Sequence, residues 1–421
     1  AVVQFDSWAV FHENASGAYY NTLKLNDLNN INELLVDAGI SSEAELSKFS
    51  LNYEYASDTT KELVFKALRQ SVISRGAHKV LVDIQKSMID DSDVLTELIE
   101  QADLLLEQQI DDINTLSPYF SGLIDDISVD LSDEIYSVLL EDLRNDGANQ
   151  LGLYADTSGY TPTTSIYDPI SSSPTLDSEW QPLPGQTALT PYWGDVKTFA
   201  TDVDQLLPES VVGPYLESGL LNNEYIDEIN EVLDFSLSLS PHQRAIAEHW
   251  EGGENTFTPP GIWLQDLDSL ITGNNLGLDE TIELNFRTTQ AMYDSSIAVW
   301  NTKYHFNSVR PGTSIRQFYA DEQLLGGLVG SDFESYLPVP PFPDIASGHS
   351  GFSASFNSVL VDYFGSNTYG GSVVLADDSS LYSENGFDGL KNVGDDVTLT
   401  WDTFSQAAEQ AGLSRLYGGI H

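Results

Sequence analysis

The chain has 421 residues, of which 65 are Asp or Glu and 17 are Lys or Arg, so its formal net charge at pH 7 is −48. Such an acidic surface repels phosphate backbones and anionic lipid headgroups, which excludes nucleic acid as an expected partner. Apolar residues make up 41 % of the chain. No apolar run reaches the roughly 18 residues that cross a bilayer, so we expect a soluble globular protein with no membrane contact.

The sequence contains no cysteine and only two methionines, Met88 and Met292. Disulfides, thiolate metal sites and a cysteine nucleophile are therefore excluded. A shortage of easily oxidised side chains fits exposure to strong oxidants, although chance alone gives the same count. The acidic composition, and a chain that starts at Ala1 without a basic leader, favour a secreted or periplasmic protein from marine or saline surroundings whose targeting signal has been removed.

Residue composition divides the chain into three regions. Residues 1–155 predict a helical scaffold, residues 156–235 a connection rich in Pro, Ser and Thr with short helices, and residues 236–421 a second helical region. We expect all three to be integrated in one structural domain. No stretch alternates long enough to indicate a sheet, so the predicted fold class is all-α, with two packed helical bundles and long irregular connecting loops.

Helical periodicity is clearest in the first region. Apolar residues recur at three- and four-residue spacing over Asp93–Ile113, which predicts an amphipathic helix. Ser42 and Glu45 have the spacing of a capping box and predict an earlier helix start.

Four further helices are predicted in the last region. The first begins at Ser240-Pro241, with Ser as N-cap, and ends at Gly252-Gly253. The second is expected from Asp279 to about Val309, with a break within it and Pro311 ending it. The third is expected from about Gly348, and the fourth over Trp401–Tyr417.

Cations are scarce in this chain, so their positions are informative. Lys303 and Arg310 are seven residues apart, which predicts that both lie on one face of a helix. Two cations on one face of a very acidic protein indicate a bound anion, with a pair of surface salt bridges as the alternative.

Ser347-Gly348-His349 predicts a turn at the start of a helix. A hydroxyl, an unhindered glycine amide and an imidazole would meet there, where free backbone amides favour an anion. Near the end of the chain Arg415 is expected in the last turn of a helix, and the following glycine pair lets His421 return to the same space. These segments together supply the donors that a tetrahedral oxyanion needs.

The combination Lys303-x6-Arg310-Pro311, Ser347-Gly348-His349 and Ser414-Arg415-x5-His421 resembles the signature of the vanadium-dependent haloperoxidases. Bacterial non-specific acid phosphatases and lipid phosphate phosphatases share this signature. The likeness to the bacterial haloperoxidases extends to most of the chain, including Thr190–Gly194 and Tyr293–Trp300, and is densest from about residue 236.

The resemblance implies vanadate as the cofactor. Lys303, Arg310 and Arg415 would bind its oxygens, assisted by the Ser347 hydroxyl and the Gly348 amide. His421 would form the protein's bond to vanadium, and His349 would act as the acid–base residue. Trp300 and Phe342 match aromatic positions beside the halide pocket of the family, with simple core packing as the alternative.

Hydrogen peroxide and a halide are the implied substrates, with bromide or iodide favoured, and the implied product is a hypohalous acid that halogenates a small organic acceptor. A homo-oligomer is left open. The resemblance also implies a carboxylate beside Arg415, for which Glu251 and Asp294 are the candidates. Family members continue past the residue equivalent to His421, typically with an acidic residue that could orient it, so we expect the sequence to be trimmed there.

Two other functions fit the same residues. One is an acid phosphatase that uses the oxyanion cage, with His421 as a nucleophile that forms a phosphohistidine and His349 as the acid. The other is an inactive acidic scaffold. The long N-terminal helical region argues against the phosphatases, which tend to be shorter, and the presence of every motif residue argues against an inactive scaffold.

Overall fold

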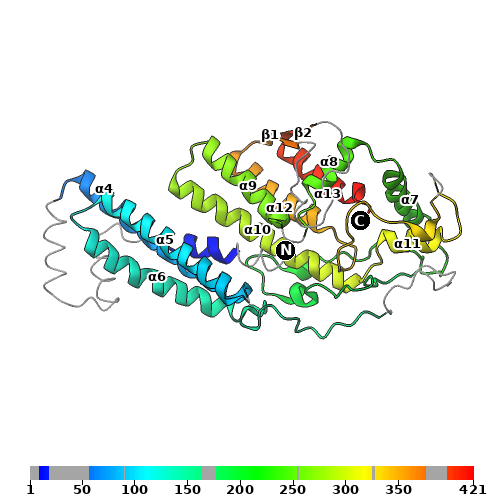
Figure 1. Ribbon diagram of the computed structural model, residues 1–421, viewed down its shortest axis with the longest axis horizontal. Helices are drawn as coiled ribbons and strands as arrows, with labels where there is room; N and C mark the ends of the chain where they lie inside the picture. Colours follow the sequence, from blue (N-terminus) through cyan, green and yellow to red (C-terminus); the bar gives the residue numbers. More distant parts are fainter. Residues whose placement is uncertain are drawn as a thin grey trace. The chain divides into compact units, whose positions relative to one another are not determined.

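The computed structural model describes residues 9–18, 56–89, 91–163, 177–253, 256–324, 328–375 and 396–421 (Figure 1). Helices dominate these residues, which confirms the predicted all-α class. The chain forms two compact units. We call Asp6–Ala155 with Asn275–Phe286 the scaffold unit, and Asp156–Asn274 with Arg287–His421 the site unit. The division of the sequence into three regions stays a prediction.

Long helices form the described part of the scaffold unit. A helix over residues 9–18 precedes α4 (Asp58–Met88), α5 (Ser92–Leu116) and α6 (Ser121–Leu143), and a 3-10 turn follows at Gln150–Gly152. Their buried apolar side chains form a main cluster and a smaller one. The main cluster contains Ala18, Val64, Ala67, Leu68, Val72, Ile113, Phe120, Ile124, Ile127 and Leu131, and the smaller one contains Val10, Val80 and Leu139.

The predicted helix over Asp93–Ile113 is confirmed as α5, which runs from Ser92 to Leu116. The Asp91 side chain caps it by accepting from the amides of Asp93 and Val94. Its apolar stripe is not wholly covered by described residues, since Leu105 is 51 % exposed. The capping box predicted at Ser42 and Glu45 lies outside the described residues.

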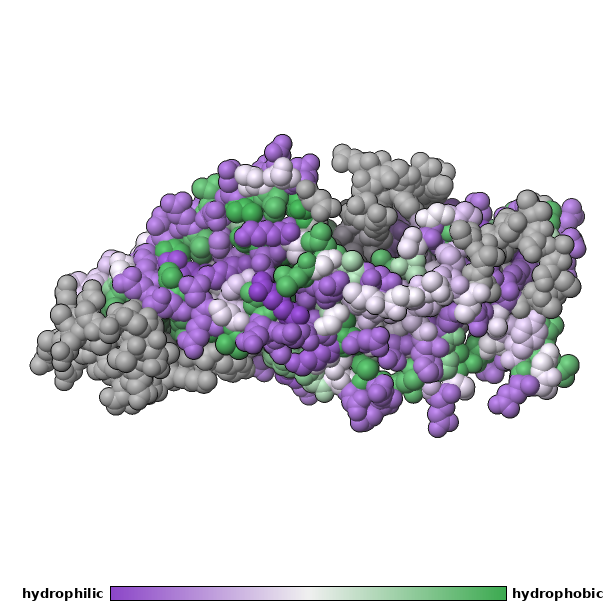
Figure 2. Space-filling model, turned by 90° about the horizontal axis from the view of Figure 1, so that it is seen from below, coloured by the Kyte–Doolittle hydropathy of each residue, from purple (hydrophilic) through white to green (hydrophobic). Residues whose placement is uncertain are grey.

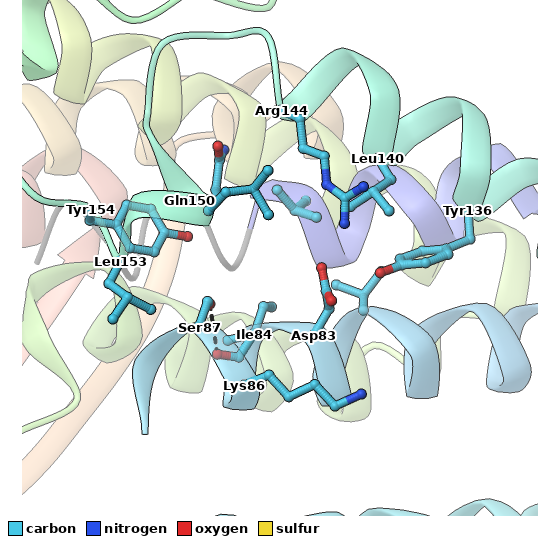
Figure 3. A pocket seen from close by; sticks show the side chains of 13 residues that line it. Asp83, Ile84, Lys86, Ser87, Tyr136, Leu140, Arg144, Gln150, Leu153 and Tyr154 are labelled. Atoms are coloured by element: carbon cyan, nitrogen blue, oxygen red, sulfur yellow. Dashed lines mark hydrogen bonds between the residues drawn. The ribbon is translucent and has the colours of Figure 1, made fainter. Parts of the chain in front are cut away.

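A pocket of about 180 Å³ lies in the scaffold unit, between α4, α6 and the turn after α6 (Figure 3). Aliphatic and polar side chains line it together, and the charged residues among them are Asp83, Lys86 and Arg144. The Asp83 carboxylate accepts a hydrogen bond from the Tyr136 hydroxyl, and burial together with this negative charge raises the pKa of Tyr136.

The site unit holds α10 and six further α-helices that the structure describes. The α-helices are α7 (Asn223–Leu237), α8 (Pro241–His249), α9 (Thr258–Gly273), α10 (Leu278–Phe306, begun in the scaffold unit), α11 (Pro311–Phe318), α12 (Gly348–Phe364) and α13 (Phe404–Tyr417). The 3-10 turns are Pro191–Asp195, Val203–Gln205 and Gly330–Asp332. Helix α13 packs against α12 and α8, so the last residues of the chain return to the middle of this unit (Figure 1).

The predicted helix start at Ser240 is confirmed, with Pro241 as the first residue of α8. Ser240 and Gln243 form a full capping box, in which each side chain bonds the other residue's backbone amide. The helix ends at His249, three residues before the glycine pair that was expected to end it.

The prediction for the stretch before Pro311 needs correction. The stretch predicted over Asp279–Val309 forms the single helix α10, which has no break and ends at Phe306. Pro311 was expected to end this helical stretch. It is instead the first residue of the next helix, α11, where the fixed φ of proline suits the first helical position.

The structure also contains a sheet that the sequence did not predict. Strands β1 (Thr368–Leu375) and β2 (Val397–Thr403) pair antiparallel, with Gly371 opposite Trp401. Glycines in β1 interrupt the period-2 pattern that predicts a strand. Trp401 therefore lies in β2, and the helix expected from it begins at Phe404, after the N-cap Thr403.

Among the described residues no helix is long and apolar enough to cross a membrane. Figure 2 shows hydrophilic residues over much of the described surface on the face that it draws, with apolar residues scattered among them.

Candidate oxyanion site

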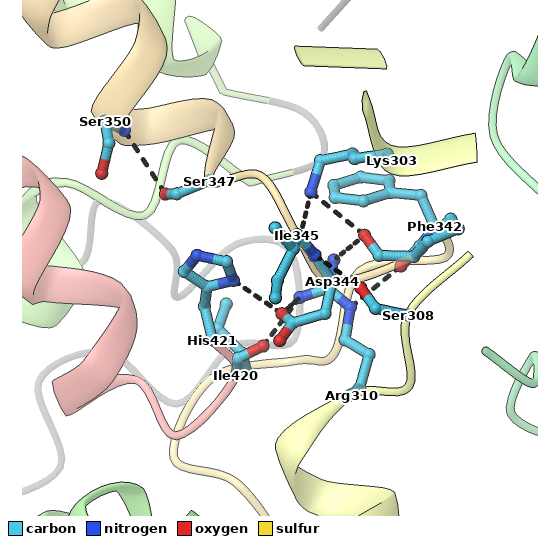
Figure 4. Close-up of polar contacts among 11 residues, drawn as sticks. Lys303, Ser308, Arg310, Phe342, Asp344, Ile345, Ser347, Ser350, Ile420 and His421 are labelled. Carbon is cyan, nitrogen blue, oxygen red and sulfur yellow. Dashed lines mark hydrogen bonds and ion pairs between the residues drawn. The ribbon is translucent and has the colours of Figure 1, made fainter. Parts of the chain in front are cut away.

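Residues from distant parts of the site unit meet around the loop that precedes α12 (Figure 4). Lys303 comes from the last turn of α10, and Arg310 is the N-cap residue of α11. Asp344 lies in the loop itself, and His421 follows the last turn of α13. Separate local structures therefore build one polar centre.

The prediction that Lys303 and Arg310 share one helix face is wrong. Helix α10 ends at Phe306, and Asn307 takes a left-handed backbone conformation with a φ of 48°. The chain then turns into α11. The two cations nevertheless lie close together. The positive charge of Arg310 accordingly helps to lower the pKa of Lys303.

Lys303 is buried, with 1 % of its surface exposed. Its ammonium donates to the carbonyl oxygens of Pro343 at 3.0 Å and Asp344 at 2.5 Å. Burial holds the pKa of Lys303 well below its usual value, Arg310 lowers it further, and the Asp344 carboxylate opposes both. A bound anion would stabilise the charged ammonium.

Arg310 is 4 % exposed and spreads its donors over two chain segments. Nε donates to the carbonyl oxygen of Phe342 at 2.9 Å, and Nη1 donates to that of Ile420 at 2.7 Å. Nη1 also lies 3.4 Å from Oδ1 of Asp344. Arg310 therefore ties the loop before α12 to the end of the chain.

Asp344 is the residue that the sequence reasoning missed. Its Oδ1 accepts from Nδ1 of His421 at 2.6 Å. Burial would raise the pKa of Asp344, but its contact with His421 and the positive charges of Arg310 and Lys303 hold it below its usual value, so the group is a carboxylate. A carboxylate directly after Pro341-Phe342-Pro343, three residues before Ser-Gly-His, was the available signal.

The end of the chain turns back as predicted. Gly419 has a φ of 72°, which is unfavourable for residues with a side chain, and its neighbour Gly418 accepts from the amide of Leu337 at 3.0 Å. This turn brings the carbonyl oxygen of Ile420 into hydrogen-bond contact with Arg310 and the ring of His421 into hydrogen-bond contact with Asp344.

Ser347-Gly348-His349 begins α12, as the sequence predicted. Ser347 is the N-cap residue, and its hydroxyl accepts from the amide of Ser350 at 3.4 Å. A Cβ at Gly348 would lie 3.2 Å from Cε2 of Phe352 and 3.9 Å from Trp300. Glycine therefore keeps the amide at this helix start accessible between two rings.

His349 donates from Nε2 to the carbonyl oxygen of Trp250 at 2.6 Å, if that nitrogen carries the proton. Burial lowers the pKa of His349 well below its usual value, and electrostatic interactions with Arg415 and His421 lower it further. Hydrogen bonds to the backbone of Trp250 and Glu251 act in the opposite direction. The imidazole is therefore neutral at neutral pH. With Nε2 donating, Nδ1 can accept a proton.

Arg415 is 5 % exposed and donates to the Ser414 hydroxyl at 3.0 Å and the Ala247 carbonyl oxygen at 3.1 Å. Burial raises the pKa of Glu251, and the charge of Arg415 opposes this rise, so Glu251 lies within its field. The carboxylate of Asp294, the other candidate, accepts from three amides of the segment that contains Phe199, Ala200 and Thr201.

Trp300 and Phe342, the predicted halide-pocket residues, lie side by side with ring centroids 5.2 Å apart. Nζ of Lys303 and Cζ of Arg310 each lie 4.9 Å from the centroid of Phe342. The ring therefore shields two cations from water and stabilises them through its π face.

The charges of this centre fit an oxyanion. Three basic side chains, Lys303, Arg310 and Arg415, are buried here. The carboxylate of Asp344 interacts electrostatically with Lys303 and Arg310, and that of Glu251 with Arg415. Burial disfavours the charged form of Lys303 and Arg310, and a tetrahedral anion would offset that cost. Vanadate and phosphate both have this shape.

Known proteins resemble this chain in part of its sequence and in its fold. Residues 283–421 match the sequence model of the VCPO second helical-bundle domain. No curated protein matches the sequence. Among solved structures, an apo-type bacterial vanadium-dependent chloroperoxidase has 20 % identity and a TM-score of 0.60, and the match covers 84 % of this chain and 79 % of that chain.

Two further solved structures are similar. The holo-type bacterial vanadium-dependent chloroperoxidase has 21 % identity and a TM-score of 0.60, over 84 % of this chain and 77 % of that chain. A bacterial vanadium-dependent iodoperoxidase has 22 % identity and a TM-score of 0.55, over 82 % of this chain and 73 % of that chain. The chain therefore has the fold of the bacterial vanadium-dependent haloperoxidases, which confirms the predicted resemblance at the level of fold.

Proposed function

We propose that the protein is a vanadate-dependent haloperoxidase. Hydrogen peroxide, a halide ion and a proton would be converted to hypohalous acid and water, and the hypohalous acid would halogenate a small organic acceptor. Bromide or iodide is the proposed halide. The net charge of −48 supports a protein that works outside the cytoplasm in saline surroundings.

The convergence of Lys303, Arg310 and His421 on one buried centre carries this proposal (Figure 4). These residues come from three parts of the sequence, and a scaffold without function has no need to bury the cations together. The haloperoxidase fold and the match over residues 283–421 support the same function.

Within this proposal Lys303, Arg310 and Arg415 hold the oxygens of vanadate, with the Ser347 hydroxyl and the Gly348 amide. His421 offers Nε2, because its Nδ1 is bonded to Asp344. Bound vanadate supplies a Lewis acid that makes peroxide electrophilic towards halide. The cations stabilise the negative charge that gathers on the oxygens during the reaction.

His349 is the proposed acid–base residue. It is neutral at neutral pH, so the ring nitrogen that carries no proton can take one from hydrogen peroxide and return one to the departing oxygen. Trp300 and Phe342 would line the approach of the halide and keep bulk water away from Lys303 and Arg310.

A phosphatase is the second candidate, because His349 and His421 lie within each other's field beside the same cations. Such an arrangement can form a phosphohistidine at Nε2 of His421 and protonate a leaving group from His349. Vanadate would inhibit that enzyme and would activate a haloperoxidase.

The test is halogenation of a phenolic dye by purified protein freed of oxyanions by dialysis. We expect bromination of the dye only when peroxide, bromide and added vanadate are all present. Added phosphate should inhibit this reaction, because it competes with vanadate for the site. The control is the Arg316→Ala variant, whose side chain in α11 donates to the carbonyl oxygen of Phe333 and should leave the reaction intact. Dye turnover that is no faster with vanadate than without it, or hydrolysis of a chromogenic phosphate that vanadate inhibits, would contradict the proposal.

A further inference from the structure

We call the pocket of about 180 Å³ between α4, α6 and the turn after α6 the scaffold pocket (Figure 3). All of the residues that line it belong to the scaffold unit, and none of them is assigned to the oxyanion site. Val80, Ile84 and Leu140 form part of its apolar wall. An apolar cavity of about 150 Å³ holds one benzene molecule, so the scaffold pocket has room for a small organic molecule.

Arg144, the C-cap residue of α6, supplies a cation to this pocket. The other two arginines of the scaffold unit, Arg69 and Arg75, form ion pairs with aspartates at 3.4 Å and 2.9 Å. Among the described residues the Arg144 side chain has no ion pair and no hydrogen bond, although the chain contains 65 acidic residues. The residue is exposed, so its N–H donors are open to a ligand.

Asp83 reaches into the same space from α4, and its carboxylate faces the Arg144 guanidinium (Figure 3). In the described part of the chain the two groups form no ion pair with each other or with another side chain. The Tyr136 hydroxyl donates to Asp83, whose carboxylate can accept further hydrogen bonds. Lys86 also lines the pocket, but its ammonium points away from Asp83 and Arg144 (Figure 3). The scaffold pocket therefore presents one anion and one cation that a ligand can bridge.

The turn that closes the scaffold pocket has an unusual backbone. Asn149, Leu153 and Tyr154 have φ values of 59°, 54° and 56°, and the left-handed region is unfavourable for leucine and tyrosine. The amide of Tyr154 donates to the carbonyl oxygen of Asn149 at 3.0 Å, and Leu153 and Tyr154 both line the pocket. Residues held in such conformations cluster at ligand sites and other functional positions. This turn is a second indication of a ligand site, independent of the two charges.

We propose that the scaffold pocket binds a free amino acid with a short apolar side chain, such as leucine. Arg144 bonds the carboxylate of the ligand, because a guanidinium matches a carboxylate through two parallel N–H groups. Asp83 accepts from the ammonium group of the ligand. The apolar side chain of the ligand lies against Val80, Ile84 and Leu140, where it is removed from water. This binding does not rest on the proposed function.

The first test compares four ligands on the wild-type protein by calorimetric titration: leucine, leucinamide, isocaproate and glycine. Leucinamide lacks the carboxylate of leucine, isocaproate lacks its ammonium group, and glycine lacks its apolar side chain. We expect each of the three to bind about tenfold more weakly than leucine, or weaker still, because each loses a charged hydrogen bond or the apolar contact. Physiological ionic strength screens the general attraction of this acidic protein for cations.

The second test assigns each charged group of the ligand to its partner. Asp83→Asn should weaken leucine binding about tenfold and leave the affinity for isocaproate nearly unchanged, since isocaproate has no ammonium group. Arg144→Gln should weaken leucine binding by a similar factor and leave the affinity for leucinamide nearly unchanged. Lys86→Gln is the matched control, because it removes a cation that points away from the pocket, and it should bind leucine as the wild type does. Thermal unfolding identifies any variant that fails to fold.

Several results would overturn the proposal. Wild-type protein that shows no saturable binding of leucine up to its solubility limit would do so, and this result needs no variant. Leucinamide, isocaproate or glycine binding as tightly as leucine would show that one of the three contacts is absent. Equal leucine affinities in the wild type, Asp83→Asn and Arg144→Gln, or an equal loss in Lys86→Gln and Arg144→Gln, would remove the assigned residues from the site.

Discussion

Nη1 of Arg310 donates to the carbonyl oxygen of Ile420 at 2.7 Å, so a cation of the site also fixes the backbone that precedes His421. The same side chain bonds the Phe342 carbonyl at 2.9 Å. Loss of Arg310 should therefore remove a proposed oxyanion donor and also loosen His421, the proposed vanadium ligand.

For Arg310→Ala we predict at least a 100-fold loss of vanadate affinity, about 3 kcal/mol, since removing one partner from a buried charge network leaves the others uncompensated. Equilibrium dialysis measures the effect, and Arg316→Ala in the same helix is the control. Equal affinities for the Arg310 variant and the wild type would remove this residue from the site.

Gly348 is in close contact with the Phe352 ring. In Gly348→Ala the new Cβ would lie 3.2 Å from this ring, which must shift by a few tenths of an ångström, and we predict a cost of about 1 kcal/mol in unfolding free energy. Anion affinity should fall as well, because the amide at this helix start is displaced. Gly273→Ala in α9 meets no atom within 4 Å and should be close to neutral in both measurements.

Phe342 should matter to both the cofactor and the halide. Its ring lies 4.9 Å from Lys303 and from Arg310, and each such contact is worth about 1 kcal/mol. We expect Phe342→Ala to bind vanadate roughly tenfold more weakly and to oxidise bromide more slowly at saturating vanadate. Phe364→Ala, which removes a ring stacked on Phe404, is the matched control. Normal kinetics in the Phe342 variant would leave this ring with a packing role alone.

Asp266 gives a prediction about pH. Burial raises the pKa of Asp266 to about 6, and a hydrogen bond from Tyr369 opposes the rise. The folded protein therefore binds a proton that the unfolded chain releases between about pH 4 and pH 6, so the stability from this group is present at low pH and lost as the pH rises.

Asp266→Asn removes that ionisation and keeps an acceptor for Tyr369. The variant should exceed the wild type in unfolding free energy at pH 8, by up to about 3 kcal/mol from the shift of roughly two pKa units, and should match it near pH 4. Denaturant unfolding at both pH values measures this. Asp268→Asn, at an exposed position of the same helix, should show a smaller difference; a larger gain in Asp268→Asn than in Asp266→Asn would refute the assignment.

Features that depend on neighbouring residues were predictable from the sequence. The apolar spacing over Asp93–Ile113 predicted α5, and Ser240 and Ser347 were correctly placed at helix starts. The same holds for the turn after Arg415, because the conformational freedom of Gly419 is a local property. Each of these signals spans only a few residues.

Features that depend on distant residues were not predictable. The contact between Asp344 and His421 joins positions 77 residues apart, and no local pattern indicates it. Lys303 and Arg310 have a helical spacing, yet the chain turns between them and the loop before α12 brings them together. The pairing of β1 with β2 likewise has a weak sequence signal, because glycines interrupt the alternation.

The most direct test of the account is a crystal structure of the protein with vanadate, measured at the vanadium absorption edge. The account predicts one anomalous peak bonded to Nε2 of His421, with oxygens held by Lys303, Arg310 and Arg415. A vanadium peak elsewhere, or none at saturating vanadate with His421 free of any ligand, would contradict it.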